Sequence, residues 1–260
     1  MKLSQVAAQL YTVRDHVLDP TAFARTVERL KSIGYAAVEL IPSDKVKDQE
    51  IARICHDNGV AVAGTHVHES VLIAHPETIV EKLEVLGSKI GVYAYPTDID
   101  LGSQLDVEQL ASRLEQSAEV LRRAGMTLAY HNHALEFSRI AGELVLNTIR
   151  RTAPTLAFEL DVYWVQYGGG NPERWIRELH GKLPTVHLKD FGFDLKKNRP
   201  FMTEVGSGNL DLPAIVAEAE RAGCEWFVVE QDETPGDPFD SLERSFQYAR
   251  HALASRETGA

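Results

Sequence analysis

The feature that most constrains this chain is a regular alternation of short apolar runs with amphipathic helical runs that end at glycine. In the first unit, Asp19 and Pro20 open a helical run that ends at Gly34. Aspartate is a favoured N-cap, proline fits the first helical position, and glycine closes helices. The unit recurs, and we expect eight strands, at residues 6–11, 35–40, 60–65, 89–95, 127–130, 156–162, 184–188 and 226–230.

This alternation predicts parallel strands that are joined by crossover helices. The helical runs are expected after residue 19, at 51–58, at 76–86, from 106, at about 142–151, after 171, from 211, and at 238–255. An open doubly wound sheet shows the same alternation. The count of eight and the absence of a glycine-rich turn after the first strand favour an α/β fold of the (β/α)₈ TIM barrel type. No linker divides the 260 residues, so a single domain, 1–260, is expected.

Net charge and cysteine content limit the binding partners and the cellular compartment that we expect. The formal net charge is −11 at pH 7, and an acidic surface repels phosphate backbones, so nucleic acid is not expected as a partner. Cys55 and Cys224 are the only cysteines, which indicates reduced thiols rather than a disulfide framework. No signal peptide is evident, and no apolar stretch approaches the roughly 20 residues of a membrane span. We therefore expect a cytoplasmic protein without a membrane partner.

Polar side chains gather at the carboxyl ends of the predicted strands, where TIM barrels carry their active sites. They are Gln9, Tyr11, Glu39, His66, His68, His131, His133, Glu159, Asp161, His187, Lys189, Glu230 and Asp232. Since strands buried on both faces are normally almost entirely apolar, these residues are expected to converge on one pocket about the barrel axis.

Several of these residues have two interpretations when taken singly. Glu39 suits either an ion pair with a neighbouring lysine or arginine or contact with a substrate. His66 and His68 suit hydrogen bonds at the rim or a functional role. Trp164, with Tyr163 beside it, suits either packing or an aromatic wall for a sugar ring.

The group as a whole indicates a metal. Burying several carboxylates together is costly unless a cation compensates. The predicted ligands are Glu136, Asp161, His187 and Glu230, and His131 is the alternative to Glu136 because it lies nearer the strand end. Mixed oxygen and imidazole ligands suit one divalent ion, Mn²⁺, Mg²⁺, Co²⁺, Fe²⁺ or Zn²⁺, and the lack of thiolate ligands argues against a cysteine-rich structural zinc site.

Six segments occur in an order that carries a family resemblance. They are QLYTVR at 9–14, YHNHALEF at 130–137, ELDVYW at 159–164, HLKD at 187–190, VGSG at 205–208 and VEQD at 229–232. Together they resemble the sugar phosphate isomerase/epimerase family of the xylose isomerase-like TIM barrel superfamily, over essentially the whole chain.

The resemblance implies one divalent metal, with Mn²⁺ the first choice, held by a Glu, Asp, His, Glu set from the late strands. Asp161, His187 and Glu230 match the last three positions. Many members have glutamate at the end of strand five, where this chain has His131, so Glu136 is carried over as the first ligand. Barrels of this kind often pair, which makes a homodimer an expectation.

The resemblance also implies chemistry on a small sugar or cyclitol. Its members include ketose 3-epimerases, inosose dehydratases, hydroxypyruvate isomerases and AP endonucleases, and some relatives cleave 3-keto glycosides. The sugar reactions share removal of a proton next to a carbonyl, which a cation assists by polarising the oxygen. His131 or His133 is the predicted acid/base on one face and Glu230 on the other. Lys189 either holds a substrate hydroxyl or enolate or forms a salt bridge to Asp161 or Glu159.

A metal-dependent sugar isomerase or epimerase is therefore the predicted function. Histidine in place of the strand-five glutamate makes a lyase, an inosose dehydratase or a 3-keto-glycoside eliminase, the alternative. An AP endonuclease-like enzyme ranks lower because of the acidic charge, and a non-catalytic sugar-binding barrel because the candidate ligand set is complete. The predicted substrate-binding residues are Gln9, Tyr11, Glu39, His66, His68 and Trp164. No lysine or arginine closely follows the glycines at 206–208, which favours a neutral sugar.

Overall fold

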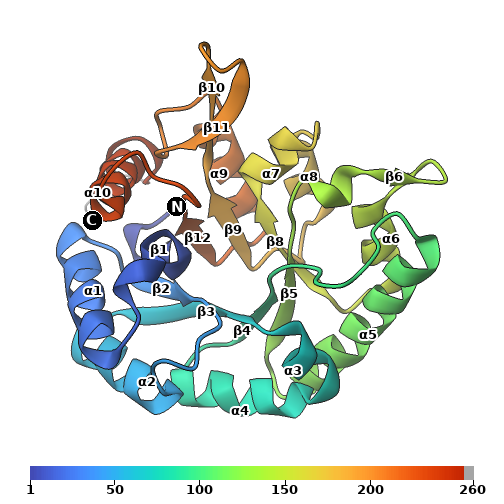
Figure 1. Cartoon of the computed structure of the whole chain (residues 1–260), viewed down its shortest axis with the longest axis horizontal. Helices are drawn as coiled ribbons and strands as arrows, with labels where there is room; N and C mark the ends of the chain where they lie inside the picture. Colours follow the sequence, from blue (N-terminus) through green and yellow to red (C-terminus); the bar gives the residue numbers. More distant parts are fainter. Residues whose placement is uncertain (255–260) are drawn as a thin grey trace.

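The eight predicted strands close into one parallel barrel, which confirms the (β/α)₈ fold (Figure 1). The computed structural model describes residues 1–254. Around the barrel the strand order is β1-β12-β9-β8-β5-β4-β3-β2. The barrel strands are β1 Val6–Gln9, β2 Ala37–Leu40, β3 Ala61–Val67, β4 Ile90–Tyr93, β5 Thr127–His131, β8 Ala157–Asp161, β9 Thr185–Leu188 and β12 Trp226–Val229.

Helices surround the barrel and begin largely where the capping residues predict. They are α1 Pro20–Ile33, α2 Asp48–Asp57, α3 Glu69–Ala74, α4 Pro76–Leu86, α5 Gln104–Arg123, α6 Val145–Thr152, α7 Val162–Tyr167, α8 Pro172–Glu178, α9 Leu212–Arg221 and α10 Pro238–Tyr248. The Asp19 and Asp211 side chains accept the N–H groups of Ala22 and Ala214, as N-caps do.

Several helix boundaries differ from the sequence prediction, and α2 begins at Asp48 rather than at residue 51. Helix α5 begins at Gln104 and not at Asp106, because the Ser103 hydroxyl accepts the Asp106 N–H as the N-cap. Helix α6 begins at Val145, since Gly142 adopts a positive φ in the turn between two short strands. Helix α10 ends at Tyr248 and is followed by a π-helical turn, Ala249–Leu253, while residue 255 lies outside the described residues.

Smaller elements that the apolar pattern did not predict occur in the loops. Strands β6 Arg139–Ile140 and β7 Glu143–Leu144 form a short hairpin after β5. Strands β10 Asp190–Asp194 and β11 Arg199–Thr203 form a longer hairpin after β9, which projects from the barrel. Three 3₁₀ segments, Leu3–Gln5, Leu10–His16 and Leu135–Phe137, complete the described elements.

The base of the β10–β11 hairpin is anchored by the buried carboxylate of Asp190. One oxygen accepts the N–H groups of Gly206 and Gly208, both at 2.9 Å, and the other accepts those of Phe191 and Leu210. Gly206 has a φ of 91°, and a Cβ on Gly208 would collide with the Asp190 carboxylate. The glycine segment at 206–208 thus binds a carboxylate of its own chain.

The barrel interior changes from apolar to polar along the strands. Small or apolar side chains form two core clusters with Trp226, and these are Ala7, Ala37, Ala63, Ile90, Val92, Ala129, Ala157 and Val228. Because alternate residues of a strand face the same side, Glu159 and Asp161 follow Ala157 into the interior, and His131 follows Ala129. Strands β5 and β8 therefore carry their interior polar side chains toward their carboxyl ends.

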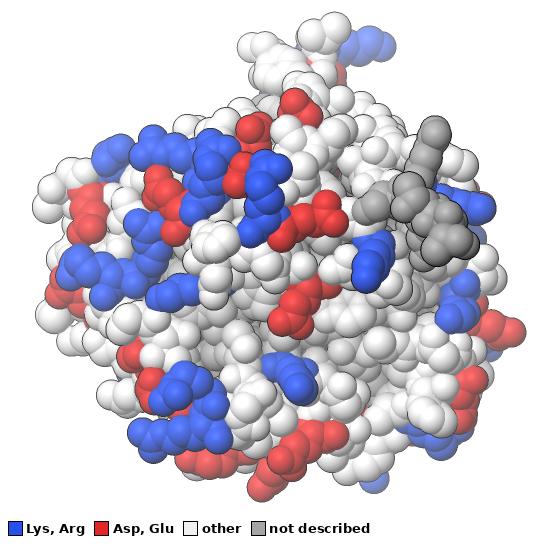
Figure 2. Space-filling model, turned by 180° about the vertical axis from the view of Figure 1, so that it is seen from behind, with Lys and Arg blue, Asp and Glu red and all other residues white. Residues whose placement is uncertain are grey.

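Charged side chains of both signs are interspersed on the face seen in Figure 2. Arg174 and Arg150 both pair with Glu178, and Arg122 pairs with Glu119. Within residues 1–254, none of the helices combines the length and the apolarity that crossing a bilayer would require.

Candidate active and metal site

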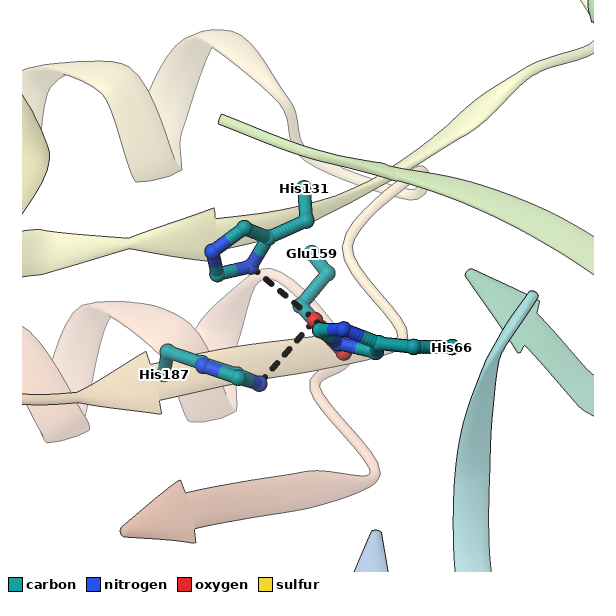
Figure 3. Close-up of side chains that lie close together, drawn as sticks. All are labelled: His66, His131, Glu159 and His187. Carbon is teal, nitrogen blue, oxygen red and sulfur yellow. Dashed lines mark hydrogen bonds and ion pairs between the residues drawn. The ribbon is translucent and has the colours of Figure 1, made fainter. Parts of the chain in front are cut away.

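Three imidazoles surround one carboxylate oxygen inside the barrel (Figure 3). The Oε1 atom of Glu159 lies 2.9 Å from His66 Nε2, 3.0 Å from His131 Nδ1 and 3.0 Å from His187 Nε2. We call these four residues the Glu159 hub. Burial alone would raise the pKa of Glu159, but the charge of His187 and the three imidazole hydrogen bonds hold that pKa well below its usual range. Glu159 is therefore an ionised carboxylate that accepts hydrogen bonds.

A second buried carboxylate, Glu39, extends the hub toward β1. Its Oε2 lies 2.7 Å from His187 Nε2 and accepts a hydrogen bond of 2.7 Å from Gln9 Nε2. Burial and the nearby charge of Glu159 raise the pKa of Glu39. Burial lowers the pKa of His66, but Glu39 and Glu159 raise it more, to about 9. Gln9, Glu39 and His66, which the sequence assigned to substrate binding, thus hold one another and His187 in place.

Closer to the carboxyl ends, a buried lysine lies among three carboxylates. Lys189 Nζ is 2.8 Å from Glu230 Oε2, 2.8 Å from Asp232 Oδ1 and 3.2 Å from Asp161 Oδ2. Burial would lower the pKa of Lys189, yet these carboxylates raise it well above its usual value. The predicted salt bridge between Lys189 and Asp161 is present. Glu230 and Asp232 also form ion pairs with Lys189.

His187 connects the hub to these carboxylates. Its Nδ1 lies 2.8 Å from Glu230 Oε2 and 3.9 Å from Asp161 Oδ2, while its Nε2 faces Glu159 and Glu39. Burial lowers its pKa, but the charges of Glu159 and Glu39 raise that pKa well above the usual value. Lys189 and the charge of His187 in turn hold the pKa of Glu230 low against the effect of burial.

His131 and His133 are neutral imidazoles. Burial lowers the pKa of His131 to about 3 and that of His133 to about 2. The two rings meet edge to face, 4.9 Å apart. Among the described residues, His133 Nδ1 is buried without a hydrogen-bond partner. A neutral imidazole with a free nitrogen can accept a proton from a bound molecule.

Asp161, His187 and Glu230 suit a divalent cation. One ligand atom of each lies within 4.8 Å of the others, and all three residues are buried. Asp161 Oδ2 is buried and, among the described residues, has an ion pair with Lys189 at 3.2 Å but accepts no hydrogen bond. Burial raises the pKa of Asp161 to about 6. Burying a carboxylate at this cost is usual where a cation compensates for its charge. The set of two carboxylates and one imidazole fits Mn²⁺ or a similar ion.

Glu136 and His68 lie outside these groups. The Glu136 carboxylate accepts hydrogen bonds of 2.8 Å from the Tyr130 hydroxyl and from the His133 N–H. It therefore orders the loop after β5, and both of its oxygens are occupied there. His68 is exposed at the start of α3.

Aromatic side chains adjoin His133 at the strand ends. The Trp164 ring lies 5.5 Å from the His133 ring, the Tyr95 ring meets the His133 ring edge to face at 4.9 Å, and Lys189 Nζ lies 5.9 Å from the Trp164 ring. Trp164 Nε1 is buried without a partner among the described residues. Tyr11 is exposed, with Arg14 over its ring. The buried polar groups that lack partners are donors and acceptors suited to a hydroxylated ligand.

Sequence reasoning placed Glu159 and Asp232 at strand ends but made neither a metal ligand, an acid/base group nor a substrate contact. The available signal was the two-residue spacing, since Glu159 must share the inward face of Asp161, and Asp232 that of Glu230. The pairing of β5 with β8 places His131 opposite Glu159, and the pairing of β8 with β9 places Asp161 opposite His187. That cross-strand register determines which residues meet.

Comparison with known proteins places the chain among related barrels. A family model described as xylose isomerase-like TIM barrel matches residues 27–252. No match to a curated protein was found. A sugar phosphate isomerase/epimerase from Parabacteroides distasonis ATCC 8503 superposes with a TM-score of 0.80, at 18% identity over 96% of this chain and 94% of that one.

Two further solved structures share the fold. The probable 3-DHS dehydratase AsbF from Bacillus anthracis has a TM-score of 0.72 and 13% identity, over 97% of this chain and 100% of that one. An L-ribulose 3-epimerase has a TM-score of 0.70 and 13% identity, with both chains covered in full. At these identities the likeness establishes the fold.

Proposed function

The chain belongs to the xylose isomerase-like TIM barrel family, and we propose that it is a metal-dependent isomerase or epimerase of a small ketose or keto-sugar. The observation that carries the proposal is the buried set of Asp161, His187 and Glu230 beside two neutral imidazoles. This combination supplies cation ligands and bases at one place. The sugar isomerase and epimerase among the structural relatives are consistent with it.

Asp161, His187 and Glu230 would hold one divalent cation, with Mn²⁺ the first choice. When bound, the cation supplies a Lewis acid that stabilises charge on a carbonyl oxygen by several kcal/mol. Lys189, protonated and buried, contributes a second positive charge beside Asp161 and Glu230. Its ammonium is placed to donate a hydrogen bond to an oxygen that becomes negative during the reaction.

Proton abstraction is assigned to an imidazole. His133 is neutral, and its Nδ1 lacks a hydrogen-bond partner among the described residues, so that atom can accept a proton from the carbon next to the carbonyl. A positioned base of this kind contributes roughly 10²–10⁴-fold. Glu230 remains ionised and is the second acid/base group. Return of the proton at the neighbouring carbon gives isomerisation, and return on the opposite face gives epimerisation.

Recognition of the substrate is assigned to the aromatic and unpaired polar groups. Trp164 offers a ring face beside His133 and an indole N–H that lacks a partner among the described residues. The segment at 206–208 is occupied by Asp190. A neutral sugar fits these groups better than a phosphorylated one, because three carboxylates already balance the positive charge of Lys189.

A lyase is the second candidate, and one observation favours it. His131 stands at the end of β5, where an opposed carboxylate would serve a symmetric epimerase. Protonation of a leaving hydroxyl or glycosidic oxygen after proton abstraction gives elimination. Nucleic-acid chemistry ranks below both because the formal net charge is −11 at pH 7, and an acidic protein repels phosphate backbones.

The test is solvent exchange in D₂O. Protein loaded with Mn²⁺ is incubated with ketoses, inososes and 3-keto glycosides, and the products are measured by mass spectrometry and NMR. Deuterium at one carbon without further change of mass supports an isomerase or epimerase. Loss of water or aglycone supports the lyase. Absence of exchange and of product with all three groups would contradict both.

Two variants serve as controls for this assay. Glu230→Gln removes a proposed ligand and base and is expected to abolish exchange. Glu204→Gln removes a buried carboxylate that pairs instead with Arg244 and Ser241, and it is expected to retain exchange. Equal exchange by the two variants would assign the reaction to another site.

A further inference from the structure

The Glu159 hub constrains the protons of its imidazoles. Glu159 Oε1 faces one ring nitrogen each of His66, His131 and His187 at 2.9–3.0 Å (Figure 3). Its other oxygen accepts the Thr185 hydroxyl at 2.9 Å. Glu159 is fully buried, so protein groups take the place of solvent as its partners.

An ionised carboxylate can only accept hydrogen bonds. Each ring nitrogen that faces Glu159 must therefore carry its hydrogen. Nδ1 of His131 has this hydrogen bond to Glu159, whereas no described residue forms a hydrogen bond with its Nε2, so the arrangement favours the proton on Nδ1 and a free lone pair on Nε2. That Nε2 lies 3.9 Å from Asp161 Oδ2. His187 likewise directs its Nε2 toward Glu159, and its Nδ1 faces Asp161 and Glu230.

We propose that Glu159 is a positioning residue that fixes the Nδ1–H tautomer of His131 and thereby makes His131 Nε2 the fourth metal-facing group, in place of Glu136. The metal part of this inference rests on the proposed function, whereas the tautomer does not. Carboxylates commonly hold metal-binding histidines in this way and set both the tautomer and the ring orientation. Here one carboxylate orients two histidines, because β8 lies between β5 and β9 in the barrel.

The hub residues could instead hold a second metal, since one ligand atom of each lies within 4.8 Å of the others. The hydrogen-bond arrangement favours the positioning role. Glu159 Oε1 already forms hydrogen bonds with His66 Nε2 and His131 Nδ1 and an ion pair with His187 Nε2, whose hydrogen bond goes to Glu39. The two roles differ in stoichiometry, with one cation per chain for the positioning role and two for a second metal site.

The wild-type protein tests the tautomer directly. With ¹⁵N-labelled histidine in the metal-free protein, long-range ¹H–¹⁵N spectra distinguish a protonated from an unprotonated ring nitrogen, and a His131→Asn variant assigns the signal. The result expected is a protonated Nδ1 and an unprotonated Nε2 in His131. A protonated Nε2 would overturn the inference, whatever the protein does with metal.

Variants then test the link to the cation. Glu159→Leu removes the acceptor and is expected to release His131 from the Nδ1–H tautomer and to weaken Mn²⁺ binding by about 10–100-fold. Glu159→Gln keeps an acceptor oxygen and is expected to restore much of the Nδ1–H tautomer of His131 and much of the Mn²⁺ affinity. Glu204→Gln, another buried carboxylate, is expected to change neither.

The outcomes separate the two proposals. The expected His131 tautomer in a protein that binds no Mn²⁺ would contradict the proposed function and leave the positioning role standing. Binding of one equivalent with unchanged affinity in Glu159→Leu would overturn the positioning role alone. Binding of two equivalents in the wild type, with one lost in Glu159→Leu, would replace it with a second metal site. If Glu159→Leu does not fold, the wild-type spectrum and Glu159→Gln decide.

Discussion

The ammonium of Lys189 lies 3.2 Å from the Asp161 carboxylate, inside the barrel and almost fully buried. The same Nζ atom contacts Glu230 at 2.8 Å. A permanent positive charge thus adjoins the carboxylates that we propose as metal ligands. Removing one partner from a buried ion pair leaves an uncompensated charge, which is more costly than the pair itself.

Lys189→Met is therefore expected to lower the free energy of unfolding of the metal-free protein by about 3 kcal/mol. Saturating Mn²⁺ should recover a large part of this loss, because a bound cation stabilises the folded state and replaces the missing charge. Urea unfolding with and without Mn²⁺ measures both effects. Lys196→Ala, at an exposed position in the β10–β11 hairpin, is the control. An equal loss with and without Mn²⁺ would separate Lys189 from the cation site.

Asp161→Asn should keep the fold and lose the metal. The amide oxygen can still accept the Trp164 N–H that Asp161 Oδ1 accepts at 2.9 Å. We therefore expect the free energy of unfolding to change by less than about 1.5 kcal/mol. Mn²⁺ affinity should fall by more than about 100-fold, which exceeds the loss typical of removing a residue that orients a ligand without touching the metal. Calorimetric titration gives the affinity, and unchanged binding would exclude Asp161 as a ligand.

The barrel could be predicted from the sequence because its signals are local. The Asp19-Pro20 pair and the closing glycine Gly34 delimit a helix without reference to the rest of the chain, and both lie where the structure has them. The β10–β11 hairpin has no such signal. Its base depends on Asp190 meeting Gly206 and Gly208, residues 16 and 18 positions away, through backbone hydrogen bonds.

Asp190→Ala should consequently loosen this hairpin. Four backbone N–H groups lose their shared acceptor, and we expect a loss of about 2–4 kcal/mol in unfolding free energy. Faster hydrogen exchange at Gly206 and Gly208 is the specific measurement. Asp194→Ala removes a carboxylate at the other end of β10 that accepts the N–H groups of Lys196 and Lys197 and pairs with the Lys197 ammonium. Comparable exchange in both variants would show that Asp190 is not the anchor.

Both cysteines should be unreactive in the folded protein. Burial raises the pKa of the Cys55 thiol to about 12 and raises that of Cys224 as well. At pH 8 each thiol is therefore protonated, and the thiolate is the reactive form. Alkylation with iodoacetamide should be negligible before unfolding and reach two groups per chain in urea. Rapid alkylation of native protein at pH 8 would contradict the burial of these thiols.

The site was predictable only in part. Asp161, His187 and Glu230 could be found because each polar residue interrupts an apolar strand near its carboxyl end. The assignment of Glu136 as fourth ligand followed a family position, whereas the structure gives both of its oxygens to Tyr130 and the loop backbone. The role of Glu159 depends on the register between β5, β8 and β9, which single strands do not encode.

The central claim is that one divalent cation binds at the carboxyl end of the barrel, between β8, β9 and β12. Anomalous diffraction at the manganese edge from crystals grown with Mn²⁺ tests it most directly. We predict one anomalous peak per chain, in contact with Asp161, His187 and Glu230 and with His131 Nε2 as the nearest further ligand. A peak within the Glu159 hub alone, or no peak at saturating Mn²⁺, would contradict the account.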